Sequence, residues 1–262
     1  MNRGYGVSAL INQEMIAPLA QAAEKDGYST FWVNDVPGGN GLEQLQLAQS
    51  ATNSIRLGVG VLPVDRWSAS SIVDEVTRVN LDPERLLIGI GAGTLHKGSL
   101  DATGEVANQL ITRLPVRVLI GALGPAMCRL AGTGSHGVIL NWLTPDAAKD
   151  LGQLTRNGAA SVGNPAPEVI AYVRTAADPR AQWRLEKEAN SYEGYPAYHR
   201  HFQRMGVAGL ETAVNGSPAE IVRRFGTYAD TVDELVARAI PASDNLADYL
   251  TVLEAARPTT SA

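Results

Sequence analysis

The segment from Pro115 to Pro145, PVRVLIGALGPAMCRLAGTGSHGVILNWLTP, decides the fold because it contains a strand, a turn, a helix and a second strand. Its two runs VRVLIGA (116–122) and GVILNW (137–142) are mostly apolar and do not alternate with polar residues, as strands are when helices cover both faces of a parallel sheet. Between them, Gly124 and Pro125 suit a tight turn into the first turn of a helix. The segment therefore predicts one βα unit of a parallel α/β fold.

Comparable apolar runs recur along the chain, each followed by a segment in which apolar residues fall three and four positions apart. The other candidate strands are 5–10, 29–33, 55–62, 85–91, 168–176 and 233–240. Eight such units in 262 residues indicate a (β/α)8 TIM barrel, with an open doubly wound sheet as the alternative. We predict a single barrel domain over 1–262, with an insertion at about 177–232 that would line the active end.

Composition limits the classes of partner. Hydrophobic residues make up 45% of the chain and charged residues 19%, and the net charge is −5. Nucleic acids and anionic membranes attract clustered Lys and Arg, which this sequence lacks, so we expect neither as a partner. The one cysteine cannot form an internal disulfide, and no apolar run is long enough to span a membrane. A cytoplasmic protein that acts on a small molecule is the expectation.

In a barrel, the reactive groups lie where the strands end. The predicted strand ends are rich in glycine and poor in titratable groups, which suits a flat phosphorylated cofactor better than a nucleophile paired with a base. After the fifth strand, the amides of Ala126 and Met127 would face an anion at a helix N-terminus. An ordinary strand-to-helix turn also explains these residues.

Three polar residues are candidates for moving a proton. Asn34 and Asp35 follow the second strand, and His96 follows the fourth, so all three fall at the active end. The alternative for Asp35 is a helix cap or a solvated carboxylate. His199 and His201 are two apart and are interpreted as solvent-facing or packing residues, and no set of histidines has the spacing of a metal site.

Aromatic residues near the strand ends are candidates for contact with ligands. Trp67 and Tyr195 are assigned to the substrate, because one follows the third strand and the other lies in the long insertion. Asn141 and Trp142 end the sixth strand, from which both can reach the barrel mouth.

Four segments carry a resemblance to a known family. They are RLGVGVLP (56–63), RLLIGIGAG (85–93), the segment 115–145 and VARAIPASDNLADYLTVLEA (236–255). On these residues the chain resembles the luciferase-like monooxygenase superfamily, particularly its branch of coenzyme F420-dependent oxidoreductases. The resemblance implies a (β/α)8 barrel whose C-terminal face binds a deazaflavin or, alternatively, FMN. Because dimers are common in that family, it also suggests a homodimer.

The resemblance also assigns cofactor contacts. The phosphate would be held by Ala122, Leu123, Gly124, Pro125, Ala126 and Met127. A non-proline cis peptide, expected between Val61 and Leu62, would lie behind the ring. The ring itself would lie over Gly91, Ala92 and Gly93, with Asn141 and Trp142 near it.

Two departures from the family pattern leave alternatives open. Many deazaflavin-dependent members have an Asp-His pair after the second strand, whereas Asp35 is followed by valine here. The connection over 94–115 is also shorter than in typical members. The first hypothesis is hydride transfer between F420 and a small organic substrate. An FMN-dependent two-component monooxygenase and a non-catalytic flavin-binding protein are the alternatives.

Overall fold

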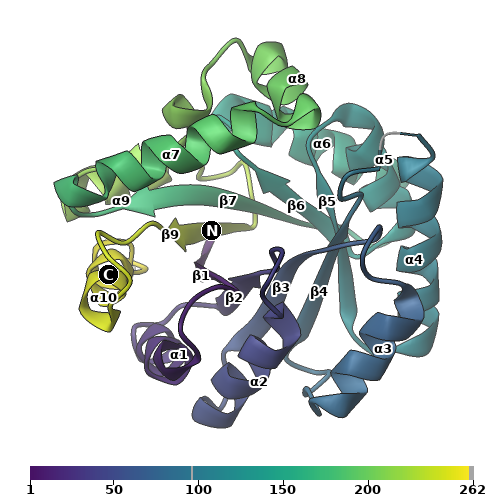
Figure 1. Ribbon diagram of the computed structural model, residues 1–262. Helices are drawn as coiled ribbons and strands as arrows, with labels where there is room; N and C mark the ends of the chain where they lie inside the picture. The colour runs from purple at the N-terminus through teal and green to yellow at the C-terminus, as the bar shows by residue number, and fades with distance from the viewer. Residues whose placement is uncertain (96, 260–262) are drawn as a thin grey trace.

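Eight parallel strands close into a barrel in the computed structural model, which describes residues 1–95 and 97–259 (Figure 1). The barrel strands are β1 (Asn2–Ser8), β2 (Thr30–Asn34), β3 (Arg56–Pro63), β4 (Leu86–Gly91), β5 (Arg117–Ala122), β6 (Gly137–Asn141), β7 (Glu168–Ala176) and β9 (Glu234–Ala239). Neighbours pair in sequence order from β1 to β7, and β9 closes the barrel between β7 and β1. The predicted barrel is confirmed, and the open sheet is excluded.

Helices surround the strands on the outside of the barrel (Figure 1). They are α1 (Ile16–Lys25), α2 (Gly41–Ala51), α3 (Ala69–Arg78), α4 (Ser99–Arg113), α5 (Pro125–Gly134), α6 (Pro145–Ser161), α7 (Gln182–Glu193), α8 (Pro196–Met205), α9 (Pro218–Gly226) and α10 (Leu246–Ala255). Polar side chains fix several starts: Asn40, Ser68 and Thr144 each accept a hydrogen bond from an amide in the first turn of their helix. In the described part of the chain, no helix combines the length and apolarity needed to cross a membrane.

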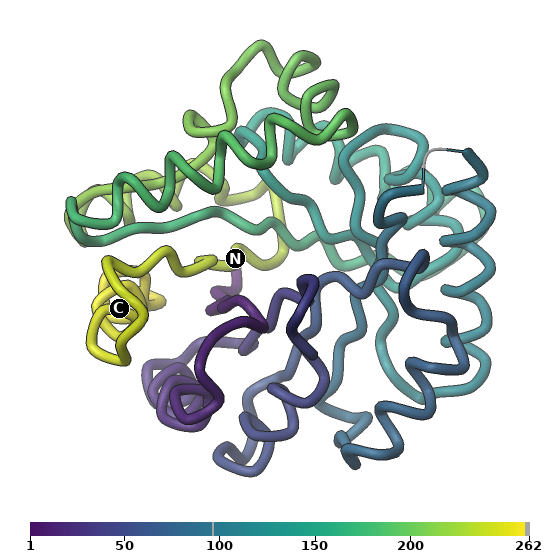
Figure 2. The backbone as a smooth tube through the Cα atoms, viewed as in Figure 1, coloured from purple at the N-terminus to yellow at the C-terminus, as the bar shows by residue number. Residues whose placement is uncertain are grey.

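The insertion between β7 and β9 holds α7, α8, α9 and a two-residue strand, β8 (Val214–Asn215), which pairs with the end of β7. Figure 2 traces this excursion of the chain out from β7 and back to β9. Strand β8 is too short to leave a periodic pattern in the sequence, so it is not among the predicted strands. The connection from β4 to β5 holds α4, in line with its short length.

Large side chains fill the interior of the barrel, which is a packed core and not a pore. This inner cluster is Trp32, Leu87, Leu119, Ile139, Ile170, Tyr172 and Val236. Inward-facing glycines of β3 make room for it, since a Cβ on Gly58 would lie 2.2 Å from the Trp32 ring. A Cβ on Gly60 would lie 2.7 Å from the Tyr172 hydroxyl. The distribution of small and large residues around the barrel therefore places Tyr172 directly beneath the end of β3.

Candidate active site

The N-terminus of α5 forms the first side of the candidate site. Gly124 is the N-cap and Pro125 the first helical residue, so the amides of Ala126 and Met127 have no partner within the helix. Arg204 of α8 reaches this point, and its Nη2 donates to the carbonyl of Leu123 at 2.6 Å. A guanidinium beside a helix N-terminus makes a site suited to a phosphate group.

His201, one turn before Arg204 on α8, holds that guanidinium in place. The Nε2 of His201 lies 2.7 Å from the carbonyl oxygen of Trp142, so it carries the hydrogen, because a carbonyl only accepts. Nδ1 is then free to accept from Nη2 of Arg204, at 3.3 Å. Burial lowers the pKa of His201, and the adjacent Arg204 lowers it further against the opposing Trp142 carbonyl. His201 is therefore a buried positioning residue, a role that its spacing from His199 did not reveal.

The end of β3 forms the second side of the site. The cis peptide lies at Gly60–Val61, so the predicted position, Val61–Leu62, is one residue too far along. The pairing of β3 with β4 is regular up to Val59 and resumes at Leu62, which leaves Gly60 and Val61 outside the regular register. Asn34 of β2 donates from Nδ2 to the carbonyl of Gly60 at 2.7 Å. Asn34 and the cis peptide are thus brought together at the mouth.

Val61 and the ends of β4 and β5 lie side by side. A Cβ on Gly91 would come within 2.8 Å of one Val61 methyl group, and a Cβ on Gly121 within 2.9 Å of the other. The Val61 side chain therefore covers the backbone of both strands. Leu62, by contrast, is fully buried in the outer core, away from this surface.

The loop after β4 turns toward the loop after β3. Gly93 has a positive φ of 61°, and the next residue, Thr94, donates from its amide and its hydroxyl to Asp65 at 2.7 and 2.6 Å. Ala92 is half-buried between this tether and Gly91. His96, the remaining histidine candidate, lies outside the described residues.

Asp35 and Trp67 lie together in the outer layer, between β2 and the helices. The Asp35 carboxylate accepts from the amide of Gly41 at 3.1 Å, from Arg66 at 2.8 Å and from the Trp67 indole at 3.3 Å. Burial raises the pKa of Asp35 despite these donors, which lower it. The carboxylate anchors the start of α2, as the helix-cap alternative expects. The same carboxylate also accepts the hydrogen bond from the Trp67 N–H, so this donor is already paired.

The third side of the mouth is a cluster of polar and aromatic side chains over β6 and β7. Asn141 accepts from Nη1 of Arg174 and donates from Nδ2 to the Tyr198 hydroxyl at 3.0 Å. Trp142 is buried and stacks on the Arg174 guanidinium, 4.3 Å from ring centroid to Cζ. Tyr195 is 54% exposed, farther out along the insertion.

Sequence reasoning missed Arg174 and its counterpart on β9, Arg238. Both are buried, and each is the one charged residue in the second half of its strand, in EVIAYVRTA and ELVARA. That position near a strand end was the signal that could have identified them. Among the described residues, no group of three or more His, Cys, Asp or Glu side chains is arranged to hold a metal ion.

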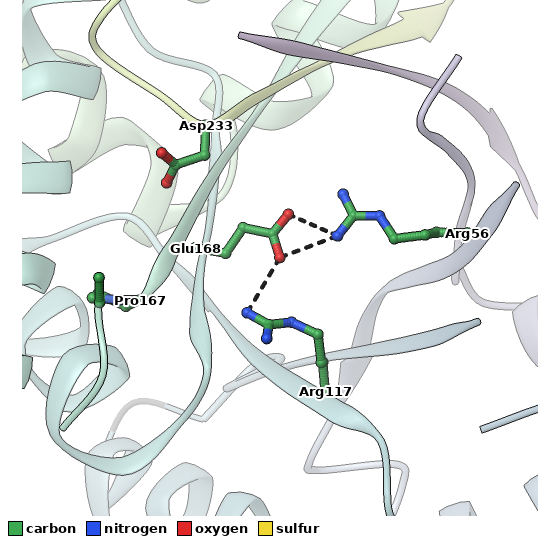
Figure 3. Close-up of a pocket in the computed structure, with 6 residues that line it drawn as sticks. Arg56, Arg117, Pro167, Glu168 and Asp233 are labelled. Atoms are coloured by element: carbon green, nitrogen blue, oxygen red, sulfur yellow. Dashed lines mark hydrogen bonds and ion pairs between the residues drawn. The ribbon is translucent and has the colours of Figure 1, made fainter. Parts of the chain in front are cut away.

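The opposite end of the barrel has a hollow of about 440 Å³ (Figure 3). Arg56 and Arg117 both pair with Glu168 there, at 2.9 and 3.4 Å, and Arg56 also pairs with Glu234 at 2.6 Å, so two carboxylates match the two guanidinium charges. These residues begin their strands, and the N-terminal end of a (β/α)8 barrel carries stability and not catalysis. We therefore do not consider this hollow a candidate active site.

Comparisons with known proteins agree with this geometry. A family model described as luciferase-like monooxygenase matches residues 94–240. The 5,10-methylenetetrahydromethanopterin reductase of Methanolobus tindarius is 25% identical over 191 residues, which cover 59% of this chain and 58% of that protein. The match thus spans less than two thirds of this curated relative.

Solved structures share the fold along nearly the whole chain. An F420-dependent secondary alcohol dehydrogenase in complex with an F420-acetone adduct superposes with a TM-score of 0.76 at 15% identity, covering 98% of this chain and 99% of the other. The oxygenating constituent of 3,6-diketocamphane monooxygenase from Pseudomonas putida, in complex with FMN, gives 0.69 at 12% identity, covering 97% and 96%.

Proposed function

Because the chain belongs to the luciferase-like monooxygenase family, we propose that it is an oxidoreductase that uses coenzyme F420 to transfer a hydride to or from a small organic substrate. The observation that carries the proposal is the helix N-terminus of α5 with Arg204 beside it, at the same end of the barrel as the Gly60–Val61 peptide. The similarity to an F420-dependent reductase and to the fold of an F420-dependent dehydrogenase supports the choice of cofactor.

The residues at the mouth fit a phosphorylated cofactor with a polar ring. The amides of Ala126 and Met127 and the Arg204 guanidinium are donors, as a phosphate requires. At the other side, the Oδ1 of Asn34 and the hydroxyl of Tyr172 are buried without a hydrogen-bond partner. An unpaired acceptor and an unpaired donor near Gly60 match the alternating N–H and C=O groups of a flavin-type ring edge.

The deazaflavin, when bound, supplies a carbon centre that accepts or donates hydride. The chain's own contribution is then to bind and orient. Arg204 and the α5 amides would fix the phosphate end, while Asn34 and Val61 would fix the ring end. Burial raises the pKa of Tyr172 well above its ordinary value, so its hydroxyl keeps a proton beneath Gly60. Positioning of this kind supplies much of the barrier reduction in hydride transfer.

Two alternatives rest on specific observations. The shared fold with the FMN-containing monooxygenase component favours FMN as a second cofactor candidate. A non-catalytic flavin-binding protein is favoured by Val36, which stands where many F420-dependent relatives have histidine, and by the commitment of Asp35 to α2.

The test is a fluorescence titration of the purified protein with F420 and, separately, with FMN. We expect F420 to bind more tightly than FMN, and reduced F420 to be oxidised when a panel of carbonyl and alkene substrates is added. Binding of FMN alone would move the assignment to the monooxygenase. Binding of F420 without turnover of any substrate would favour the non-catalytic alternative, and binding of neither cofactor would overturn the proposal.

A further inference from the structure

Two buried arginines stand next to each other at the barrel mouth. Arg174 of β7 is 3% exposed and Arg238 of β9 is 8% exposed, and the strand register places them directly opposite one another. Neighbouring strands lie only roughly 4.8 Å apart, so two permanent positive charges share one poorly solvated corner. Such an arrangement is unfavourable unless negative charge balances it.

One carboxylate, that of Glu188 on α7, serves both arginines. It accepts from Nε of Arg174 at 3.0 Å and lies 3.8 Å from Nη2 of Arg238. Burial would raise the pKa of Glu188, but the two arginines outweigh that effect and lower it, so the carboxylate is ionised. Within residues 1–95 and 97–259, no other carboxylate lies within 4 Å of either guanidinium. The corner therefore keeps a surplus of one positive charge.

Nearby acidic residues do not remove this surplus. Asp244 pairs with Arg184 at 2.6 Å, and Asp178 pairs with Arg180 at 2.6 Å. Asp248 also forms an ion pair with Arg180, at 3.5 Å. These three carboxylates pair with two arginines outside the arginine pair, and none of the three lies within 4 Å of Arg174 or Arg238.

Hydrogen bonding in the pair is also incomplete. Arg174 is fixed, because it binds Glu188 and Asn141 and stacks on Trp142. Arg238 donates from Nη1 to the carbonyl of Ala239, but its Nε is buried with no acceptor. A buried donor left unpaired costs about 1–3 kcal/mol, and more when the group is charged. Buried polar and charged groups without a full set of hydrogen bonds concentrate at ligand-binding sites.

We propose that the substrate of this mouth carries a carboxylate group, which Arg238 binds while Arg174 supports its charge and position. The assignment of this anion as the substrate rests on the proposed oxidoreductase function. A guanidinium and a carboxylate match in shape and charge, and the carboxylate would take up the unused Nε. One surplus positive charge is balanced by a monoanion such as a carboxylate, whereas a phosphate dianion would leave one negative charge unbalanced.

The experiment compares each acid with its uncharged amide. Calorimetric titrations of the protein, with and without F420, would use benzoate against benzamide and butyrate against butyramide. We expect each carboxylate to bind about tenfold or more tightly than its amide, the ratio typical of a charged hydrogen bond. Equal binding of acid and amide by the folded protein would overturn the inference.

Two variants change the charge of the corner in opposite directions, and a third keeps the charge but changes the donor geometry. Arg238→Gln should abolish the preference for carboxylate, and Arg238→Lys should retain part of it, because lysine keeps the charge but not the fork of donors. Glu188→Gln should increase the preference, since the surplus rises to two. Arg200→Gln, at an exposed position on α8, is the matched control and should change nothing. Arg238→Gln and Glu188→Gln are expected to shift the preference for carboxylate in opposite directions. If one of these variants fails to fold, the other still tests the inference.

Parallel cofactor titrations separate this inference from the proposed function. Loss of the carboxylate preference with F420 binding intact would overturn only the inference. A preserved preference with no cofactor binding would overturn the oxidoreductase proposal and leave the anion site. If Arg238→Gln weakens binding of F420 but not of its deazariboflavin core, which lacks the anionic tail, the pair serves the cofactor and the inference is wrong.

Discussion

His201 shows how a single buried side chain can set the chemistry of a neighbouring site. It accepts from Arg204 only while Nδ1 is unprotonated, and burial lowers the pKa of His201, so the neutral form is the one that the fold favours. A proton on Nδ1 would remove the acceptor and place a second cation against Arg204. The geometry of the proposed phosphate site, formed by the α5 N-terminus and Arg204, is thus tied to the protonation state of His201.

The predicted consequence is a pH dependence of cofactor affinity. The Nδ1 acceptor that His201 offers to Arg204 is fully available above the ordinary histidine pKa of about 6.5. It is lost as the pH falls through the lowered pKa of His201. Titrations of F420 between pH 7.5 and 4.5 should show weaker binding at the acid end. His201→Gln, which can still accept from Arg204, should flatten that loss. An unchanged profile in the variant would show that another group titrates.

Asp35 carries a second prediction at this scale, because the sequence made it a catalytic candidate and the structure makes it an anchor. Asp35→Ala leaves the amide of Gly41 and the indole of Trp67 without an acceptor, so we expect the free energy of unfolding to fall by about 1–3 kcal/mol. F420 affinity should stay within about twofold. A large loss of turnover in folded variant protein at unchanged stability would contradict this assignment and restore the catalytic one.

Single residues near the mouth were the hardest to place from the sequence. The turn at Gly124 and Pro125 was recognisable because glycine and proline have specific backbone demands. The pairing of Arg174 with Glu188, or of His201 with Trp142, depends on tertiary contacts between segments that the sequence does not connect. The alternation of side chains along β2 explains why Asn34 faces the mouth and Asp35 the helices, once the register is known.

At the scale of elements, the barrel strands were predictable because strands buried on both faces leave continuous apolar runs. The insertion was recognisable by its length but not by its structure. Its helix α7 presents Leu185 and Ala189 to the core and Glu188 to the arginine pair, and α8 brings Arg204 to α5. These two helices link the mouth's polar groups to the rest of the fold, so the insertion is part of the candidate site.

At the scale of the whole molecule, the two ends of the barrel differ in how they satisfy charge. At the N-terminal end, the fully buried Glu234 accepts from Trp32 at 2.6 Å and from Thr30 at 2.9 Å and pairs with Arg56 at 2.6 Å. Both oxygens of Glu234 are therefore paired with donors inside the barrel. At the C-terminal end, Asn34, Tyr172 and Arg238 each keep an unpaired buried atom. Inside the barrel, the satisfied network therefore lies at the N-terminal end and the unpaired atoms lie at the C-terminal end. On the outer face of the strands, Arg3 at the start of β1 also keeps Nε and Nη1 buried without an acceptor, with its guanidinium over the Phe225 ring.

This contrast predicts where a substitution costs stability. Glu234→Ala leaves the Arg56 guanidinium and the Trp32 N–H uncompensated, so the free energy of unfolding should fall by about 3–5 kcal/mol. Urea unfolding followed by circular dichroism measures it, with Glu84→Ala at an exposed position as the control. A loss below about 1 kcal/mol would mean that this network does not hold the barrel end together.

The most direct test of the account is the difference in affinity between F420 and its deazariboflavin core, measured by fluorescence titration in the unmodified protein and in Arg204→Gln. If α5 and Arg204 hold the cofactor phosphate, F420 should bind at least about tenfold more tightly than the core, and the substitution should remove most of that difference while leaving the affinity for the core unchanged. Equal affinities in the unmodified protein, or a difference that survives Arg204→Gln, would contradict the assignment of the mouth as a site for a phosphorylated cofactor.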